Sequence, residues 1–132
     1  MKRIGYLFEK VYDLENCRNA ILEASENKRR RRNVKRIMKR IDYYAEKLSE
    51  MIKSETWECS PYTVRYINDG IRQKRRKLAK PRFWPDQCIH HAFDRVVGPL
   101  LAKSQYYYCT GCVKGKGIKL SKRGLELFIK RH

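Results

Sequence analysis

Long apolar runs are the clearest absence in this chain of 132 residues. No segment approaches the roughly 18 consecutive apolar residues that a membrane-spanning helix requires. The start of the chain, Met1-Lys2-Arg3-Ile4-Gly5, also lacks the apolar stretch of a secretory signal. Both absences predict a cytoplasmic protein that has no membrane partner.

Acidic residues are scarce as well. The chain has 14 Asp and Glu against 32 Lys and Arg, which gives a formal net charge of +18. Self-repulsion of this size opposes a compact state, so we expect a partner of opposite charge to bind. A membrane surface or an acidic protein could supply that charge, but nucleic acid is the commonest partner of such a basic chain. The composition therefore predicts nucleic-acid binding.

Catalytic signatures are missing too. The chain contains no phosphate-binding P-loop, no G-x-S-x-G nucleophile motif and no H-E-x-x-H zinc motif. Its five aspartates are scattered, and none forms the adjacent pair expected of a two-metal phosphoryl-transfer site. The sequence therefore predicts no catalytic residue, no metal ligand and no cofactor within this chain.

The five cysteines are an odd number, which favours reduced thiols over a disulfide framework. Cys109 and Cys112 have the two-residue gap of a zinc knuckle, but a structural zinc site usually needs a second pair of ligands. The nearest candidates are Cys88, His90 and His91, which fall on a predicted helix. A zinc-dependent nucleic-acid module therefore stays open as an alternative.

The pattern of apolar residues predicts an α+β fold that is mainly helical. Apolar residues recur at helical spacing over residues 13–27, where Asp13 can cap the first turn. The same spacing runs without a break from Val34 to Ile52, which predicts one continuous amphipathic helix with a basic outer face.

Two more helices are expected in the second half of the chain. One covers residues 89–101 with Asp86 as its N-cap, and Gly98-Pro99 should kink it or split off its last turn. Ser121 is the expected cap of the other. The apolar face of that helix should point inward through Leu125, Phe128 and Ile129.

A basic β-hairpin is predicted between the helical parts. Residues 62–67 are β-branched and aromatic with rough alternation, and Asn68-Asp69-Gly70 is a turn signal. The return strand covers residues 71–80, in which Lys74, Arg76 and Lys80 share one face. The opposite face carries Arg75 and Lys77. Such a ribbon can lay two rows of cations along phosphates, although a charged edge strand that discourages aggregation is the alternative.

Two further segments are candidates for phosphate contact. The first is a basic run made of Lys28, Arg29, Arg30, Arg31 and Arg32, for which a solvated surface is the alternative.

The second follows three tyrosines at residues 106–108, which could stack on bases. Its glycines let a backbone approach a sugar-phosphate chain, and its lysines attract anions. These residues are Gly111, Lys114, Gly115, Lys116 and Gly117. A flexible surface loop is the alternative.

The order of these pieces resembles the N-terminal region of bacterial reverse transcriptases, the enzymes of group II introns, retrons and diversity-generating retroelements. The matching segments are KRRKLAKP at residues 74–81, PDQCIHHA at 85–92, GPL at 98–100 and GCVKGKG at 111–117. The family patterns are K-x-R-x-I/L-x-x-P, D-R/Q-x-I/V-x-x-A and S-x-x-G-K/R-G. The match covers residues 57–132, and residues 1–27 resemble the leader of prophage-borne members.

The resemblance implies a basic N-terminal helical region at residues 1–56 and a fingers-like region at residues 57–132 that carries the hairpin and the glycine-rich loop. It implies that Lys74 and Arg76 approach the phosphates of the incoming nucleotide. It also implies that residues 111–117 lie along the template, although Cys112 and Lys114 depart from the family pattern. The palm domain, its aspartates and their Mg²⁺ would lie beyond the chain.

The expected function is therefore that of a nucleic-acid-binding fragment of an RNA-directed DNA polymerase, which is not catalytic alone. Its expected partners are an RNA template or an RNA–DNA hybrid, together with the palm domain or another protein. The alternative is a free-standing basic RNA-binding accessory protein. A fragment should expose the apolar face of the last helix, whereas a complete protein should cover it.

Overall fold

A computed structural model describes residues 4–70, 74–111, 113 and 115–131. The fold is α+β and mainly helical, as predicted. The chain forms two compact units, Met1–Val97 and Gly98–His132, called here the first and second units. The predicted division after residue 56 concerned regions of sequence and stays a prediction. None of the helices within the described ranges combines the length and apolar content that crossing a membrane requires.

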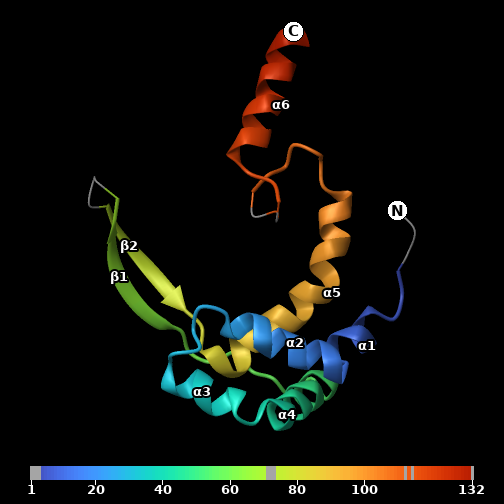
Figure 1. Cartoon of the computed structure of the whole chain (residues 1–132), viewed down its shortest axis with the longest axis vertical. Helices are drawn as coiled ribbons and strands as arrows, with labels where there is room; N and C mark the ends of the chain where they lie inside the picture. The colour runs from blue at the N-terminus through green and yellow to red at the C-terminus, as the bar shows by residue number, and fades with distance from the viewer. Residues whose placement is uncertain (1–3, 71–73, 112, 114, 132) are drawn as a thin grey trace. The chain divides into compact units, whose positions relative to one another are not determined.

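The first unit opens with helices that pack on one another. They are α1 (Leu7–Tyr12), α2 (Leu14–Ser25), α3 (Arg32–Met38) and α4 (Ile41–Lys53). Helix α2 lies against α4 (Figure 1). The predicted start of α2 is confirmed, because the Asp13 carboxylate accepts a hydrogen bond from the Asn16 backbone N–H at 3.2 Å.

The single helix predicted from Val34 to Ile52 is wrong. Helix α3 ends at Met38, and Arg40 departs from helical geometry with φ −134° and ψ 45° before α4 begins. Cations spaced four apart, Lys35 with Lys39 and Arg36 with Arg40, repel along a helix and weaken it at this point. The apolar residues of both helices remain buried in spite of the break: Val34, Ile37, Ala45, Leu48 and Ile52.

One hydrophobic core holds the first unit together, because side chains from α1 to α5 are buried in the same cluster. A polar contact adds to it between α2 and the later helix α5 (Cys88–Ser104). The Asn16 amide donates to the carbonyl oxygens of Val11 at 2.9 Å and Ala92 at 3.1 Å. Arg95 donates to the Asn16 side chain at 3.0 Å and pairs with Glu23. These bonds fix α5 against the N-terminal helices.

The predicted hairpin is present. Strand β1 (Thr63–Asp69) pairs antiparallel with β2 (Lys74–Lys80), with Thr63 opposite Lys80, and the pair extends from the helices as a ribbon (Figure 1). The turn comes later than predicted, because Asn68 and Asp69 still belong to β1, while Gly70 has the positive φ of +70° that favours glycine. Residues 71–73 of the predicted return strand lie outside the described residues.

A wide helical turn, η1 (Phe83–Gln87), connects β2 to α5. Asp86 lies inside this turn and is fully buried, so the prediction that it caps the next helix is wrong. Helix α5 also continues through Gly98 and Pro99 to Ser104, so its last turn is not split off there, and the predicted alternative, a kink at this point, stays a prediction. A proline removes only one hydrogen bond of the helix, and the bonds on either side can hold the turn.

The second unit ends in α6 (Ile118–Arg131), which begins before the predicted cap. Ser121 lies within the helix, and its hydroxyl bonds to that of Thr110. The predicted inward face is exposed, and no described residue of α6 is buried. The close packing in this unit is at Gly124, where an added Cβ would lie 2.6 Å from the Tyr108 ring. Among the described residues, α6 therefore packs on Tyr108 without contributing a buried side chain.

Candidate nucleic-acid interface

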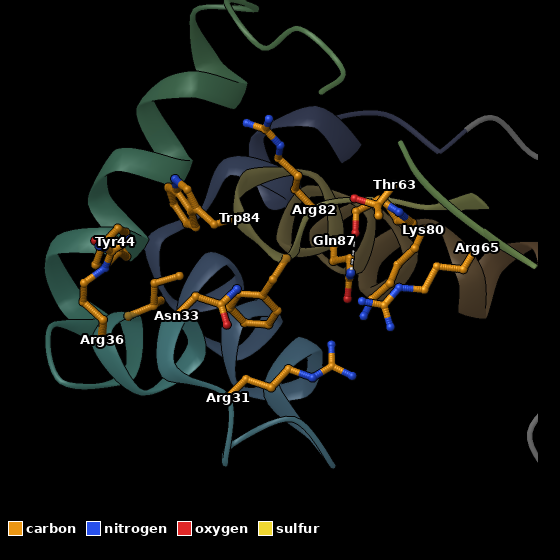
Figure 2. A pocket seen from close by; sticks show the side chains of 13 residues that line it. Arg31, Asn33, Arg36, Tyr44, Thr63, Arg65, Lys80, Arg82, Trp84 and Gln87 are labelled. Atoms are coloured by element: carbon orange, nitrogen blue, oxygen red, sulfur yellow. Dashed lines mark hydrogen bonds between the residues drawn. The ribbon is translucent and has the colours of Figure 1, made fainter. Parts of the chain in front are cut away.

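A basic cleft lies in the first unit, at the base of the hairpin (Figure 2). Its volume is about 350 Å³. Its cations come from the basic run, α3, both strands and the segment that follows them. They are Arg31, Arg36, Arg65, Lys80 and Arg82. No carboxylate is among the described residues that line it. Such a hollow attracts anions, because no carboxylate among these wall residues offsets the positive charge.

Aromatic and neutral polar side chains complete the wall. Tyr44 and Trp84 meet edge to face, with ring centroids 4.9 Å apart and an interplanar angle of 71°. The amide and hydroxyl groups of Asn33, Thr63 and Gln87 also line the cleft. In Figure 2, Tyr44 and Trp84 lie on one side of the cleft, and Arg65 and Lys80 lie on the other. One side of the cleft is therefore aromatic, with Arg36 beside Tyr44, and the other side is cationic.

One side chain of the basic run, that of Lys28, points inward and bonds to a residue of the cleft wall. Lys28 donates from Nζ to the Gln87 side-chain oxygen at 2.7 Å, and Gln87 donates in turn to the carbonyl oxygen of Pro81 at 2.8 Å. Burial, together with the charges of Arg31 and Lys80, lowers the pKa of Lys28 from its ordinary value. Two cationic segments that are far apart in the sequence thus meet beside the cleft.

The two faces of the hairpin differ in that only one of them leads into the cleft. Residues directly opposite in an antiparallel pair share a face, so Thr63, Arg65 and Ile67 lie on the face of Lys80, Leu78 and Arg76. Three of these six, Thr63, Arg65 and Lys80, also line the cleft. The predicted row of Lys74, Arg76 and Lys80 therefore runs along one face of the ribbon and ends in the cleft.

The other face of the hairpin carries Arg75 and Lys77, as predicted. The Arg75 guanidinium lies over the ring of Tyr66, 4.4 Å from its centroid. This cation–π contact holds Arg75 along the ribbon. The residues of β2 are exposed apart from Lys80, which is half-buried, so the strand presents cations to solvent on both faces.

A buried carboxylate fixes both ends of the hairpin beside the cleft. The Asp86 side chain accepts from Trp57 Nε1 at 3.1 Å and from the Ser60 backbone N–H at 3.3 Å. Trp57 and Ser60 precede β1, whereas Asp86 follows β2. Burial alone would raise the pKa of Asp86, but the hydrogen bonds from Trp57 and Ser60 outweigh it and hold that pKa below its ordinary value.

The glycine-rich segment belongs to the second unit. Gly115 has a φ of +80°, a conformation that favours glycine, and Gly111 and Gly117 are exposed. Lys116 donates to the carbonyl oxygen of Tyr107 at 2.7 Å and lies over its ring at 5.1 Å, so its ammonium is held within the loop. Lys114 and Cys112 lie outside the described residues.

Sequence reasoning found part of this interface. Of its candidates, Arg31 and Lys80 line the cleft, while Arg29, Arg30 and Arg32 are exposed on the basic run. It missed the other cleft cations, Arg36, Arg65 and Arg82, and both aromatic residues of the wall. Alternation along β1 could have suggested Arg65. No local pattern marks Arg36 or Arg82.

Thiols and metal ligands form no visible site in the described part of the chain, which contains no group of three or more His, Cys, Asp and Glu arranged for a metal ion. Burial raises the pKa of the Cys17 and Cys88 thiols to about 12. Cys88 donates to the carbonyl oxygen of Phe83 at 3.3 Å. His90 stacks edge to face on Trp57, with centroids 5.9 Å apart.

Comparison with known protein families finds no family model that matches this chain. No curated protein matches it either.

Proposed function

We propose that this chain binds nucleic acid as the fingers region of an RNA-directed DNA polymerase in the cytoplasm. The observation that carries the proposal is the continuity of the cleft with one cationic face of the hairpin. A row of cations that ends in a hollow without carboxylates suits a sugar-phosphate chain, because phosphate contacts dominate affinity for nucleic acids. Aromatic groups at the end of that row add a surface for bases.

Each part of the interface has a separate role in this proposal. Lys74 and Arg76 contact phosphates, those of the incoming nucleotide in the polymerase and those of a single strand when no nucleotide is bound. Lys80 holds an RNA template or an RNA–DNA hybrid, and Arg75 and Lys77 contribute less to this contact because their face does not lead into the cleft. The exposed arginines of the basic run extend that contact, and the glycine-rich segment makes a contact of its own with nucleic acid. Catalysis needs the palm domain and its Mg²⁺, which the residues of this chain do not supply.

The apolar face of α6 supports a role beside further protein. Leu125 is 60% exposed and Ile129 is 65% exposed, and Leu127 is also exposed. Side chains of this kind are stabilised when a neighbouring surface covers them. A fragment of a polymerase is expected to expose this face, whereas a free-standing RNA-binding protein is expected to cover it.

Salt-dependent binding tests the proposal. Single-stranded RNA and an RNA–DNA hybrid should bind the whole chain, with log affinity falling linearly as log salt rises. Changing Lys74→Gln with Arg76→Gln should weaken binding and flatten the slope on single-stranded RNA by roughly 0.7 for each phosphate that the variant no longer neutralises. Fluorescence anisotropy over a salt series measures both quantities.

The matched control is Arg75→Gln with Lys77→Gln, which removes two cations from the opposite face of the same strand. It should flatten the slope less than the Lys74 and Arg76 pair does, because its face does not lead into the cleft. Affinity weaker than about 100 µM at physiological salt, or affinity that salt does not change, would contradict nucleic-acid binding.

The sequence of the gene distinguishes a polymerase fragment from a free-standing RNA-binding protein. A reading frame that continues past codon 132 into a strand bearing an aspartate, and later an Asp-Asp pair, would support the polymerase. A stop codon directly after codon 132 would support the free-standing protein.

A further inference from the structure

The size of the cleft limits what it can hold. Sites for small ligands have volumes of roughly 300–1,000 Å³, and this cleft, at about 350 Å³, lies at the lower end of that range. A double helix does not enter a hollow of this size, whereas a single nucleotide unit does. The hairpin outside the cleft is a ribbon rather than a groove, so the cleft is the hollow part of this cationic face.

The two sides of the cleft match the two parts of a nucleotide. Arg65 and Lys80 lie together on one side, and Trp84 with Tyr44 on the other (Figure 2). Arginine binds phosphate oxygens in pairs through its planar fork. An aromatic ring stacks on a base of any identity, because every base has a π-face. Asn33 and Gln87 add amide groups that can bond to a sugar or a base edge.

The charge of the cleft favours a phosphate monoester over a phosphodiester. An internal phosphate of a strand carries one negative charge, whereas a terminal monoester carries about −1.5 to −2 at pH 7. Five cations line the cleft, with no carboxylate among its described wall residues. This excess is offset more fully by the terminal group.

We propose that the cleft binds one nucleotide that bears a terminal phosphate monoester, with the phosphate between Arg65 and Lys80 and the base against Trp84. The inference rests on the proposed function and adds to it a site for the end of a strand. From Lys80 the same face continues past Leu78 to Arg76 and Lys74, with successive residues of that face about 6.6 Å apart. A strand anchored in the cleft by its phosphorylated end would follow that row.

Nucleotide titrations test the site directly. The chain has two tryptophans, so its NMR spectrum should show two indole N–H signals, and Trp84→Phe assigns them. Adenosine 5′-monophosphate should shift the Trp84 signal and bind at least roughly tenfold more tightly than adenosine, because a charged hydrogen bond contributes about that factor. Inorganic phosphate should compete with the nucleotide.

Two variants of equal charge localise the binding. Arg65→Gln with Lys80→Gln removes the two cations that the proposal places at the phosphate. The backbone pairing of the hairpin does not depend on these side chains, so the fold should be retained. This pair should weaken the monophosphate by roughly tenfold or more. Lys10→Gln with Lys53→Gln, which removes two exposed lysines outside the cleft, should leave its affinity unchanged. Equal effects of the two pairs would overturn the site.

Oligonucleotides decide the source of the phosphate and separate this inference from the proposed function. A 5′- or 3′-phosphorylated oligoadenylate that binds more tightly than its hydroxyl form would place a strand end in the cleft. Tight monophosphate binding without that difference would place a free nucleotide there. If oligonucleotides bind with a salt-dependent affinity but neither the monophosphate nor a terminal phosphate is recognised, the site is overturned and nucleic-acid binding stands. If nothing binds, both fail.

Discussion

Asp86 is the residue whose environment differs most from what its sequence position suggests. It is fully buried, yet it is a carboxylate in a chain whose carboxylates are few. One oxygen accepts from Trp57 and Ser60, while Oδ2 has no partner among the described groups. A buried charge is stable only where donors face it, so these two bonds maintain its ionised form. Through them, Asp86 joins the segment before β1 to the turn after β2.

Changing Asp86→Ala should lower the free energy of unfolding by about 1–3 kcal/mol for each donor left without an acceptor. The donors are the Trp57 indole and the Ser60 backbone N–H. Urea unfolding at neutral pH measures the loss. The control is Asp94→Ala on the exposed surface of α5, which should change stability by no more than about 0.5 kcal/mol.

The same variant predicts a pH dependence. Because the folded pKa of Asp86 lies below its ordinary value, its contribution is fully present above the unfolded pKa of about 3.9. The contribution is lost as pH falls through the lower folded pKa. The stability difference between wild type and Asp86→Ala should therefore shrink in acid. A difference of the same size at about pH 6 and about pH 2 would contradict an ionised Asp86.

At the scale of elements, the basic run at residues 28–32 is not uniform. Lys28 is half-buried and bonds to Gln87, and Arg31 lines the cleft. Arg29 and Arg30 are exposed and do not line it. One short segment thus has an inner part that supports the cleft and an outer part that is available to a more distant stretch of the same nucleic acid.

Changing Arg29→Ala with Arg30→Ala should flatten the salt dependence of single-stranded RNA binding, by roughly 1.4 if each arginine contacts one phosphate. The affinity for adenosine 5′-monophosphate should not change, because these arginines lie outside the cleft. The control removes two exposed lysines, Lys10 on α1 and Lys53 at the end of α4. If the salt dependence of the arginine variant equals that of the wild type, these two residues contact no phosphate and belong to the solvated surface.

Elements governed by local rules were predictable from the sequence. The Asp13 cap, the pairing of the hairpin and its two cationic faces depend on neighbours along the chain and on a period of two. The break after Met38 was not predictable, because apolar spacing continues across it while the repelling cations act on the opposite face. The exposed face of α6 was mispredicted because periodicity shows which face is apolar, not whether a surface covers it.

The cleft was predictable only in part, because it too depends on contacts between residues that are far apart in the sequence. Its cations lie on segments separated by up to about fifty residues, and nothing local to Arg36 or Arg82 distinguishes them from other surface arginines. Tertiary contacts bring those segments together, among them the hydrogen bonds of Lys28, Gln87 and Asp86 and the common hydrophobic core. A site assembled by tertiary contacts needs the fold before its members can be identified.

The whole molecule carries a net charge of +18, and this charge is placed mostly on exposed side chains. Ion pairs in the described part of the chain connect only a few of them, such as Arg18 with Asp42 and Arg95 with Glu23. Unpaired cations repel one another over about 10 Å at 0.1 M salt, which destabilises the compact state. An anion that binds the folded chain removes part of this repulsion and adds its own binding free energy.

Salt and polyanions should therefore stabilise the chain in different ways. Raising salt from about 0.01 M to about 1 M shortens the screening length from about 30 Å to about 3 Å, so Tm should rise without any ligand. At about 0.1 M salt, single-stranded RNA at roughly 100 times its Kd should raise Tm by roughly 10 °C, and this gain should largely vanish at about 1 M. Differential scanning fluorimetry measures both effects. Dextran sulfate should give a gain through charge alone, and uncharged dextran should give none. Equal gains from dextran and RNA, or a Tm that falls with salt, would contradict a chain whose stability is limited by its own positive charge.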